Sequence, residues 1–260
     1  MKFSIIVVCY NAGDKLKATV DSILLQTYTD YEVIVKDGLS TDESISKIVK
    51  DEKITLCCKA DLGIYDAMNQ AIEISKGDYL IFLNCGDFFY SIDTLEKINQ
   101  KLEKNPSRGI YYGDMYHIGK EARETMPKEI DAFSCYRHMP CHQAITYDKA
   151  MFRDKKYDIS YKIRADFEHF LWAFFEKKII PYYLDEPIAK YEGEGFSEKK
   201  ENKKLDKEEH RKITEKYIPK AQLFKYKLIM LLTLAPLRSK IANSRQTAKI
   251  YDSIRSKLYR

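Results

Sequence analysis

Unbroken apolar runs alternate with helical apolar spacing along the first ninety residues. Runs of this kind, with no polar residue at every second position, are typical of strands that are buried on both faces of a sheet. The predicted strands are Phe3–Cys9, Tyr31–Val35, Ile54–Cys58 and Tyr79–Leu83. The predicted helices between them are Asp14–Thr27, a segment from about Asp42 to about Val49, and Asp66–Ser75. Strand and helix alternate with short links, so this part of the chain predicts βαβ units and a parallel sheet.

The second half has the same two periodicities in a less regular order. Residues 88–102 carry leucine and isoleucine at helical spacing, and His169–Lys177 predicts an aromatic helix. The predicted strands are Gly109–Tyr112, Pro140–Tyr147 and a final strand that contains Ile188–Tyr191. Residues 198–215 alternate in charge and predict a solvated helix.

Charge divides the chain unevenly. The net charge of the 260 residues is +5, but residues 198–260 hold 18 basic and 7 acidic residues, whereas residues 1–197 are net acidic. A basic tail on an acidic body favours a polyanionic partner for the tail. Six cysteines without a CxxC pair, and a start that does not resemble a signal peptide, favour reduced thiols in the cytosol.

The tail also contains an apolar run at residues 228–237. Ten residues are too few to span a bilayer. Lys225, Lys227, Arg238 and Lys240 flank the run, which favours an interfacial segment on anionic lipid at the inner face of the membrane. The alternative is a helix that packs on the body with its basic face in solvent.

Acidic residues collect where the predicted strands end. Asp37 and Asp87 follow two of them, and Asp61 and Asp66 lie between. The carboxyl ends of strands in an open α/β sheet are where ligands bind, and carboxylates there suit a ribose, a base or a metal on a diphosphate. No GxGxxG and no Walker lysine motif is present. The alternative for each acid alone is that it closes a turn or caps a helix.

Five segments together resemble the family 2 inverting glycosyltransferases of the type that build bacterial surface polysaccharides. The segments are SIIVVCYN, SILLQTY, YEVIVKDGLSTD, DLGIYDAMNQAI and GDYLIFLNCGD. The resemblance covers about residues 1–200 and implies an α/β fold of the GT-A type, a central, mostly parallel sheet flanked by helices. Residues 1–90 would bind the nucleotide-sugar and residues 91–200 would hold the acceptor, with residues 201–260 as a helical basic extension.

The resemblance assigns donor-binding residues along the edge of the sheet. Asp37 would bond the base, most often uracil, in a loop shaped by its neighbours, and residues 63–69 would cover the donor. The full set implied for the donor is Cys9, Tyr10, Asn11, Asp37, Gly38, Ser40, Asp61, Asp66, Asn69 and Asn84. A Gly-rich turn ending at Ser197 would lie near the diphosphate.

The resemblance also implies a divalent metal. Asn84-Cys85-Gly86-Asp87 occupies the place of the family's DxD-type motif, and it departs from the two-acid form because its first residue is Asn84. Asp87 would therefore be the principal carboxylate for Mn²⁺ or Mg²⁺, with water and the donor diphosphate as further ligands.

Catalysis would fall to the second half. Asp166 begins the aromatic helix and would be the general base that an inverting transfer needs, with Glu168 as the substitute. His142 and Gln143 match the segment that forms the active-site wall, whereas Asp114 reads as structural.

These residues predict a transfer from a nucleotide-sugar, UDP-linked in most of the family, to a saccharide or lipid-linked saccharide. One alternative is a sugar nucleotidyltransferase, although such enzymes carry a Gly-rich basic loop where this chain has Tyr10–Asp14. Another is a non-enzymatic adaptor that binds membrane or nucleic acid through the tail. The acidic body and the absence of a nucleic-acid motif argue against nucleic acid as a partner.

Overall fold

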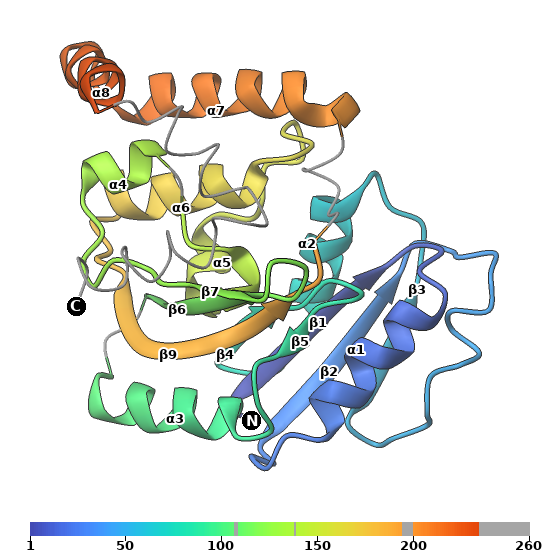
Figure 1. The fold of residues 1–260 in the computed structure, drawn as a ribbon. Helices are drawn as coiled ribbons and strands as arrows, with labels where there is room; N and C mark the ends of the chain where they lie inside the picture. Colours follow the sequence, from blue (N-terminus) through green and yellow to red (C-terminus); the bar gives the residue numbers. More distant parts are fainter. Residues whose placement is uncertain (107–108, 138, 194–199, 234–260) are drawn as a thin grey trace.

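In the computed structural model, one curled sheet of nine strands runs through the molecule (Figure 1). The structure describes residues 1–106, 109–137, 139–193 and 200–233. The strands are β1 (Phe3–Cys9), β2 (Tyr31–Asp37), β3 (Ile54–Cys58), β4 (Tyr79–Phe82), β5 (Phe88–Phe89), β6 (Ile110–His117), β7 (Ala122–Glu124), β8 (Ile145–Asp148) and β9 (Tyr182–Tyr191). Their order is β3-β2-β1-β4-β8-β6-β9-β5, with β7 paired to β6.

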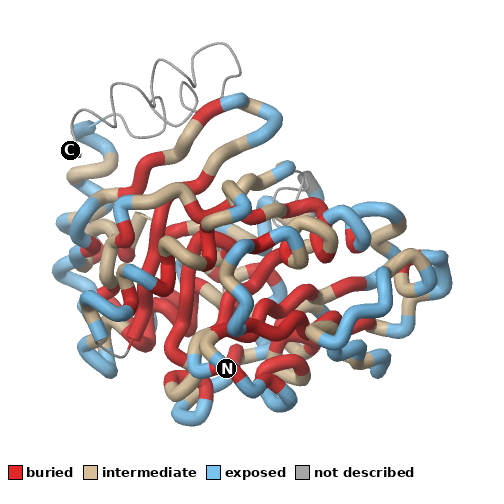
Figure 2. Tube along the Cα trace, turned by 90° about the horizontal axis from the view of Figure 1, so that it is seen from below, coloured by how far each residue is buried: buried red, intermediate tan, exposed pale blue. Residues whose placement is uncertain are grey.

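The first four strands are all parallel, as the βαβ reading predicts. Beyond β4 the sheet is mixed, because β8 joins β4 and β6 antiparallel and β9 runs parallel to β6. The predicted α/β class with a central sheet is therefore confirmed, with the parallel part confined to the β1–β4 half and to the β6–β9 pair. Figure 2 shows the sheet strands as the buried centre of the molecule, with exposed chain around them.

Helices cover both faces of the sheet and explain the unbroken apolar runs. Consecutive residues of β1, such as Ile5 and Ile6, enter two different apolar clusters, one on each face. Leu16 and Val20 of α1 (Asp14–Leu24) and Leu95 of α3 (Thr94–Lys104) fill the first cluster. The other face is covered by α2 (Ile64–Ile74), α4 (Ala132–Arg137), α5 (Ala150–Asp154) and α6 (Ala165–Phe175).

Three predicted elements differ in the structure. The helix predicted from Asp42 to Val49 is wrong, since this stretch forms turns. The Asp42 carboxylate accepts the backbone N–H and the hydroxyl of Ser44 and the N–H of Gly13, and such local bonds compete with a helix. Phe88–Phe89 is a strand ahead of α3, and His142–Ala144 is a 3₁₀ helix ahead of β8.

A close backbone approach fixes the start of β4. A Cβ on Gly77 would lie 2.5 Å from the Ser4 nitrogen, so no side chain fits there. The Gly77 N–H donates to the Ser4 hydroxyl at 2.8 Å, and that hydroxyl donates to buried Glu32 at 2.6 Å. Glycine therefore lets the loop from α2 settle against β1 and sets where β4 enters the sheet.

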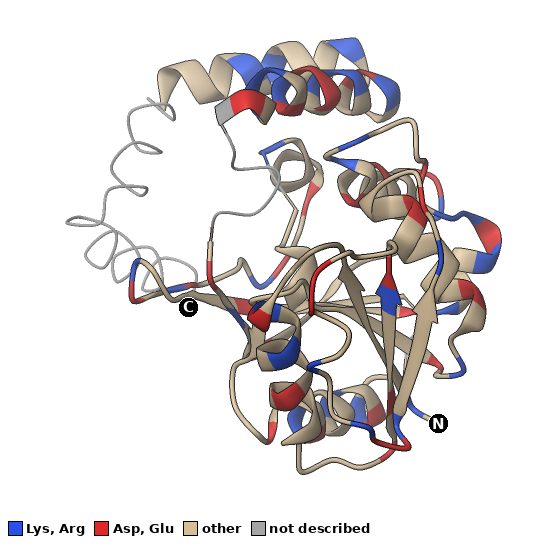
Figure 3. Ribbon diagram, turned by 90° about the vertical axis from the view of Figure 1, so that its right-hand side faces the viewer, with Lys and Arg blue, Asp and Glu red and all other residues tan. Residues whose placement is uncertain are grey.

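Within the described residues, a 3₁₀ turn at Lys200–Asn202 and two α-helices follow β9. Helix α7 (Lys203–Tyr217) is not the wholly solvated helix that its charges predict, because Ile213 and Tyr217 join the core beneath it. Figure 3 shows the alternation of basic and acidic residues along the rest of this helix. Helix α8 (Lys220–Leu232) follows, and no helix within the described ranges is long and apolar enough to cross a bilayer. Residues 194–199 and 234–260, and with them Ser197 and the end of the basic tail, lie outside the described residues.

Candidate active site

The strand register brings the predicted donor residues to one edge of the sheet. Cys9 pairs with Asp37, and Asp37 pairs with Cys58, so three parallel strands end side by side. The loop after β1 is joined to the loop after β2, because the Asn11 N–H donates to the Ser40 hydroxyl at 2.8 Å. Ser40 is itself held by the Asp37 carboxylate, which accepts its backbone N–H at 2.9 Å. The two loops thus form one rim, as the placement of acids at strand ends predicts.

A cavity of about 620 Å³ opens beside this rim. Its lining joins β1, the loop after β3 and the start of α2, and includes Val8, Cys9, Tyr10, Asp61, Leu62, Gly63, Ile64, Ala67, Lys162 and Leu205. Tyr10 is 67% exposed, which leaves its ring free to contact a planar ligand. Asp61 is fixed by the buried Lys36 ammonium at 2.8 Å. A Cβ on Gly38 would lie 2.8 Å from the Asp61 carboxylate, so Gly38 lets Asp61 and Tyr10 close over the loop.

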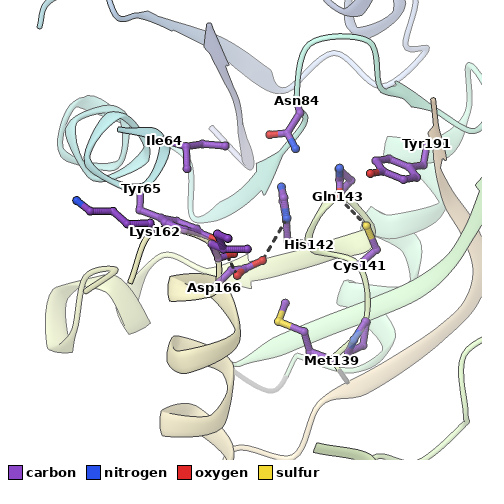
Figure 4. Close-up of a pocket in the computed structure, with 12 residues that line it drawn as sticks. Ile64, Tyr65, Asn84, Met139, Cys141, His142, Gln143, Lys162, Asp166 and Tyr191 are labelled. Carbon is purple, nitrogen blue, oxygen red and sulfur yellow. Dashed lines mark hydrogen bonds and ion pairs between the residues drawn. The ribbon is translucent and has the colours of Figure 1, made fainter. Parts of the chain in front are cut away.

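A second cavity of about 210 Å³ adjoins the first (Figure 4). The two cavities share Ile64 and Lys162 in their walls. The other lining residues of the smaller cavity are Tyr65, Asn84, Met139, Pro140, Cys141, His142, Gln143, Ile163, Asp166 and Tyr191. A ligand that filled the larger cavity would reach the smaller one across these two residues.

Asp166 lies in the smaller cavity at the start of α6, with its side chain 16% exposed. One carboxylate oxygen accepts the Tyr65 hydroxyl and the Phe167 N–H, both at 2.8 Å, and the other faces His142 Nδ1 at 3.3 Å. Burial by itself would raise the pKa of Asp166, but the bonds from His142 and Tyr65 outweigh it and hold the pKa below its ordinary value. Asp166 is therefore ionised at neutral pH and able to accept a proton.

Asp87 lies nearby in a different environment. It is 3% exposed, accepts Gln143 Nε2 at 2.7 Å and accepts the Glu192 N–H at 3.2 Å. Burial raises the pKa of Asp87 above its ordinary value despite these two bonds. Because Asp87 holds its proton up to a higher pH than an exposed aspartate does, a cation that binds Asp87 competes with that proton over a wider pH range.

The 3₁₀ helix His142–Ala144 connects the two carboxylates. Each of two neighbouring residues on this turn contacts one of them: His142 faces Asp166 (Figure 4), and Gln143 donates to Asp87. His142 Nε2 and Asn84 Oδ1, which belong to two residues lining this cavity, are buried without a hydrogen-bond partner. Unpaired buried polar atoms are costly, so these two atoms are positioned to bond a ligand.

The oxygen atoms present fit a hard divalent cation in part. Asp87 keeps free lone pairs on each oxygen and Asn84 Oδ1 is unpaired, and both are ligand types that Mg²⁺ and Mn²⁺ accept. Across the part of the chain that the structure describes, no group of three or more His, Cys, Asp or Glu side chains is arranged around a metal position. The protein would thus contribute one carboxylate and one amide, and a bound diphosphate and water would complete the shell.

Three of the predicted site residues point elsewhere. Asn69 bonds the backbone of Tyr157 with both ends of its amide, and Asp66 accepts the N–H of Leu62 at the start of α2. Glu168 is wholly buried behind the site, where the ammonium groups of Lys155 and Lys216 each lie 2.6 Å from one oxygen. None of the three lines either cavity. Asp114, expected to be structural, is buried and accepts from Arg123, Tyr183 and the Met126 N–H.

Two residues of the site were not singled out from the sequence. Tyr65 was expected only as part of a segment that covers the donor, yet its hydroxyl reaches Asp166 from 101 positions away in the chain. Lys162 is the one Lys or Arg among the described residues that line the two cavities. A signal for Lys162 existed, since it stands four residues before the predicted base.

Comparison with known proteins bears on the family and the fold, and confirms the GT-A fold class. The family model described as "Glycosyl transferase family 2" matches residues 4–180. A Mycobacterium bovis protein named "PGL/p-HBAD biosynthesis glycosyltransferase" is 32% identical over 195 residues, 73% of this chain and 76% of that protein. The Escherichia coli "UDP-Glc:alpha-D-GlcNAc-diphosphoundecaprenol beta-1,3-glucosyltransferase WfaP" is 34% identical over 123 residues, 45% of this chain and 47% of that one. Among solved structures, TarS of S. aureus in complex with UDP superposes with a TM-score of 0.60 at 18% identity, covering 74% of this chain and 61% of that one.

Proposed function

This chain belongs to glycosyl transferase family 2, and we propose that it transfers a sugar from a UDP-sugar, with inversion, to a saccharide or lipid-linked saccharide. The observation that carries the proposal is the 3₁₀ turn whose His142 faces Asp166 while Gln143 faces Asp87. A proton acceptor that lines the smaller cavity is thereby linked, through two consecutive cavity-lining residues, to a buried carboxylate for the metal. Family membership favours transfer over the nucleotidyltransferase and adaptor alternatives.

The larger cavity is the donor site in this proposal. Tyr10 stacks on the base, and Asp37, Asp61 and the Asn11–Ser40 rim contact the nucleoside. Lys162 stands where the two cavities join and places a positive charge beside the diphosphate. The transferred sugar then lies over Ile64, toward Asp166.

Transfer requires one proton to move. The acceptor hydroxyl attacks the anomeric carbon from the side opposite the nucleotide diphosphate. The hydroxyl oxygen bonds that carbon while the bond between the carbon and the diphosphate oxygen breaks. The hydroxyl proton goes to Asp166. Tyr65 and His142 orient the Asp166 carboxylate and keep it ionised before the attack. The apolar wall of Ile64, Met139 and Ile163 limits the access of water, which would otherwise compete as the acceptor.

Asp87 and Asn84 would hold the cation, which when bound offsets charge on the leaving diphosphate. Because the protein contributes few ligands, Mn²⁺ affinity is weak without nucleotide and rises when UDP is present. Calorimetry measures both affinities. Tight Mn²⁺ binding to the nucleotide-free protein would contradict this assignment.

Helix α8 supports a membrane-associated acceptor. Phe224, Leu228, Leu231 and Leu232 recur at positions that share one helix face and are 46–72% exposed. Three lysines and no acid belong to the same helix, a pattern typical of segments that lie on anionic lipid. The name of the E. coli relative, which includes diphosphoundecaprenol, is consistent with a lipid-linked acceptor.

Sedimentation with vesicles tests the membrane part. Full-length protein should pellet with anionic vesicles and not with neutral ones, and Phe224→Ser with Leu231→Ser should release it. Failure of the unmodified protein to pellet would remove the membrane from the proposal without affecting the transfer reaction.

A panel of nucleotide-sugars tests the reaction itself. Each is incubated with the protein, with and without Mn²⁺, and released UDP, GDP and pyrophosphate are measured. Release of UDP from one UDP-sugar, stimulated by Mn²⁺, is expected. In a separate incubation with UTP and a sugar phosphate, release of pyrophosphate would instead establish a nucleotidyltransferase.

A further inference from the structure

The segment that precedes α6 forms part of the wall of both cavities. Lys162 lines the two of them, and Ile163 and Asp166 line the smaller one. The positions of one cationic and one acidic side chain of the site therefore depend on the backbone of only five residues, 162–166.

A carboxylate on α7 accepts three consecutive backbone N–H groups of this segment. Glu209 is 4% exposed, and its oxygens lie 2.7 Å from the Lys162 nitrogen, 3.0 Å from that of Ile163 and 2.9 Å from that of Arg164. Arg164, which stands at the N-cap position of α6, makes no side-chain cap. A residue 45 to 47 positions later in the chain thus bonds the N–H groups that lead into the helix.

A second contact comes from one turn earlier on α7. Arg164 Nε lies 2.7 Å from one oxygen of Asp206, and Arg164 donates to the other oxygen at 3.0 Å. On the opposite side, the Ile163 carbonyl is 2.5 Å from the Tyr65 hydroxyl that also reaches Asp166. The 162–164 backbone is held between α7 and α2.

We propose that Glu209 is a positioning residue for glycosyl transfer, which fixes residues 162–164 so that Lys162 faces the donor and Asp166 faces the acceptor. Helix α7 lies beyond residues 4–180, the part matched by the family model, so this chain supplies part of its catalytic apparatus from its own C-terminal extension. The inference rests on the proposed function, because it assigns Asp166 and Lys162 their roles in transfer.

The chemistry requires a carboxylate at this place. Three converging N–H donors can all be accepted by a carboxylate, whereas the amide of glutamine has one acceptor oxygen and presents N–H groups of its own. Replacement by glutamine leaves at least one backbone donor unpaired with little change in volume. The segment is then released by a fraction of an ångström or more, and displacements near 1 Å at a reacting group cost up to about 100-fold in rate.

The test compares Glu209→Gln with Glu208→Gln. Glu208 is adjacent on α7 but exposed, with its carboxylate paired to Lys212 on the same helix at 3.0 Å, so the control changes the same atoms without touching the segment. Hydrogen exchange of the 162–166 backbone, the thermal midpoint and the turnover number with saturating donor are measured for both. Asp206→Asn serves as a second, milder variant.

We expect Glu209→Gln to speed exchange at residues 162–164 alone and to lower kcat by about tenfold to 100-fold. Asp206→Asn should change both in the same direction by less, and Glu208→Gln should change neither. Unchanged exchange at 162–164, unchanged kcat, or faster exchange throughout the protein would each overturn the proposal. Should the unmodified protein turn over no nucleotide-sugar, the proposed function fails, whereas the exchange measurement still decides whether Glu209 holds the segment.

Discussion

The hydroxyl of Tyr65 offers a sharp test of how the proposed base is tuned. It lies 2.8 Å from Asp166 Oδ1 and 2.5 Å from the carbonyl oxygen of Ile163. Burial and the charge of Asp166 raise the pKa of Tyr65 well above its ordinary value, so the phenol stays protonated and can only donate to a carboxylate. Tyr65→Phe removes this donor and leaves the ring, and with it the packing against Tyr157 at 5.5 Å between ring centres.

The expected effect follows from the strength of one bond. A hydrogen bond to a charged group contributes about 1.5–3 kcal/mol, and one pKa unit corresponds to about 1.4 kcal/mol. One hydroxyl proton is shared between two acceptors here, which favours the lower end of that range. Loss of the bond should therefore raise the pKa of Asp166 by about one unit.

The pH dependence of kcat/KM measures this shift. The acid limb has two steps: Asp87, whose pKa burial raises, contributes the upper one, and Asp166, whose pKa is lowered, contributes the lower one, which is the limb that reports on Tyr65. In Tyr65→Phe the limb should move to higher pH by about one unit, while the rate at neutral pH changes little, since Asp166 is still ionised there. His142 and the Phe167 N–H continue to orient the carboxylate.

Tyr31→Phe is the matched control. It deletes a buried tyrosine hydroxyl that donates to a backbone carbonyl, that of Ile23, at 3.0 Å, and Tyr31 belongs to the apolar cluster on the other face of the sheet. Both variants should lose about 1 kcal/mol of stability, but only Tyr65→Phe should move the acid limb. An acid limb that stays in place in Tyr65→Phe, or that moves equally in both, would refute the reasoning.

Three further predictions concern the metal, the buried charge and the fold. Asp87→Asn should lower kcat/KM by about 100-fold or more and abolish the increase in UDP affinity that Mn²⁺ produces. Initial rates measure the first effect and calorimetry the second. Activity that Mn²⁺ still stimulates in this variant would contradict the metal assignment. Glu168→Gln should cost about 3 kcal/mol of unfolding free energy at pH 7, since it removes the buried negative charge that pairs with Lys155 and Lys216, yet keep turnover within a few-fold. Burial by itself would raise the pKa of Glu168, but the bonds from Lys155, Lys216 and Tyr217 prevail and lower it. The stability that ionised Glu168 adds is therefore lost as pH falls through that pKa. Denaturant titrations should show the unmodified protein and Glu168→Gln converging in stability in acid. Gly77→Ala should lower the thermal midpoint, because its Cβ would meet the Ser4 backbone at 2.5 Å, whereas Gly119→Ala, with its nearest neighbour at 3.8 Å, should not.

Strands β1, β2 and β4 follow from the sequence because burial on both faces makes most of their positions apolar. Ile5 and Ile6 illustrate this, since consecutive residues of β1 enter opposite cores. The gathering of Cys9, Asp37 and Cys58 follows from parallel pairing alone. Periodicity misled at residues 42–49, where the Asp42 side chain bonds the backbone of Ser44 and competes with a helix.

The contacts that tune the site do not follow from local pattern. Tyr65 and Asp166 are 101 residues apart in the sequence. Glu209 accepts the backbone N–H of Lys162, which lies 47 residues earlier. Glu209 lies in a charge-alternating stretch in which every acid looks equally solvated. Only the packing of α7 over the start of α6 distinguishes it from its exposed neighbour Glu208, and that packing depends on the whole fold.

The rate of sugar transfer by Asp166→Asn, at saturating donor, tests the central claim most directly. The side chain keeps its size and can still bond Tyr65, but it can no longer accept a proton. We predict that kcat falls by about 10²–10⁴ while the affinity for UDP with Mn²⁺ is unchanged. Turnover within a few-fold of the unmodified enzyme would show that Asp166 is not the base.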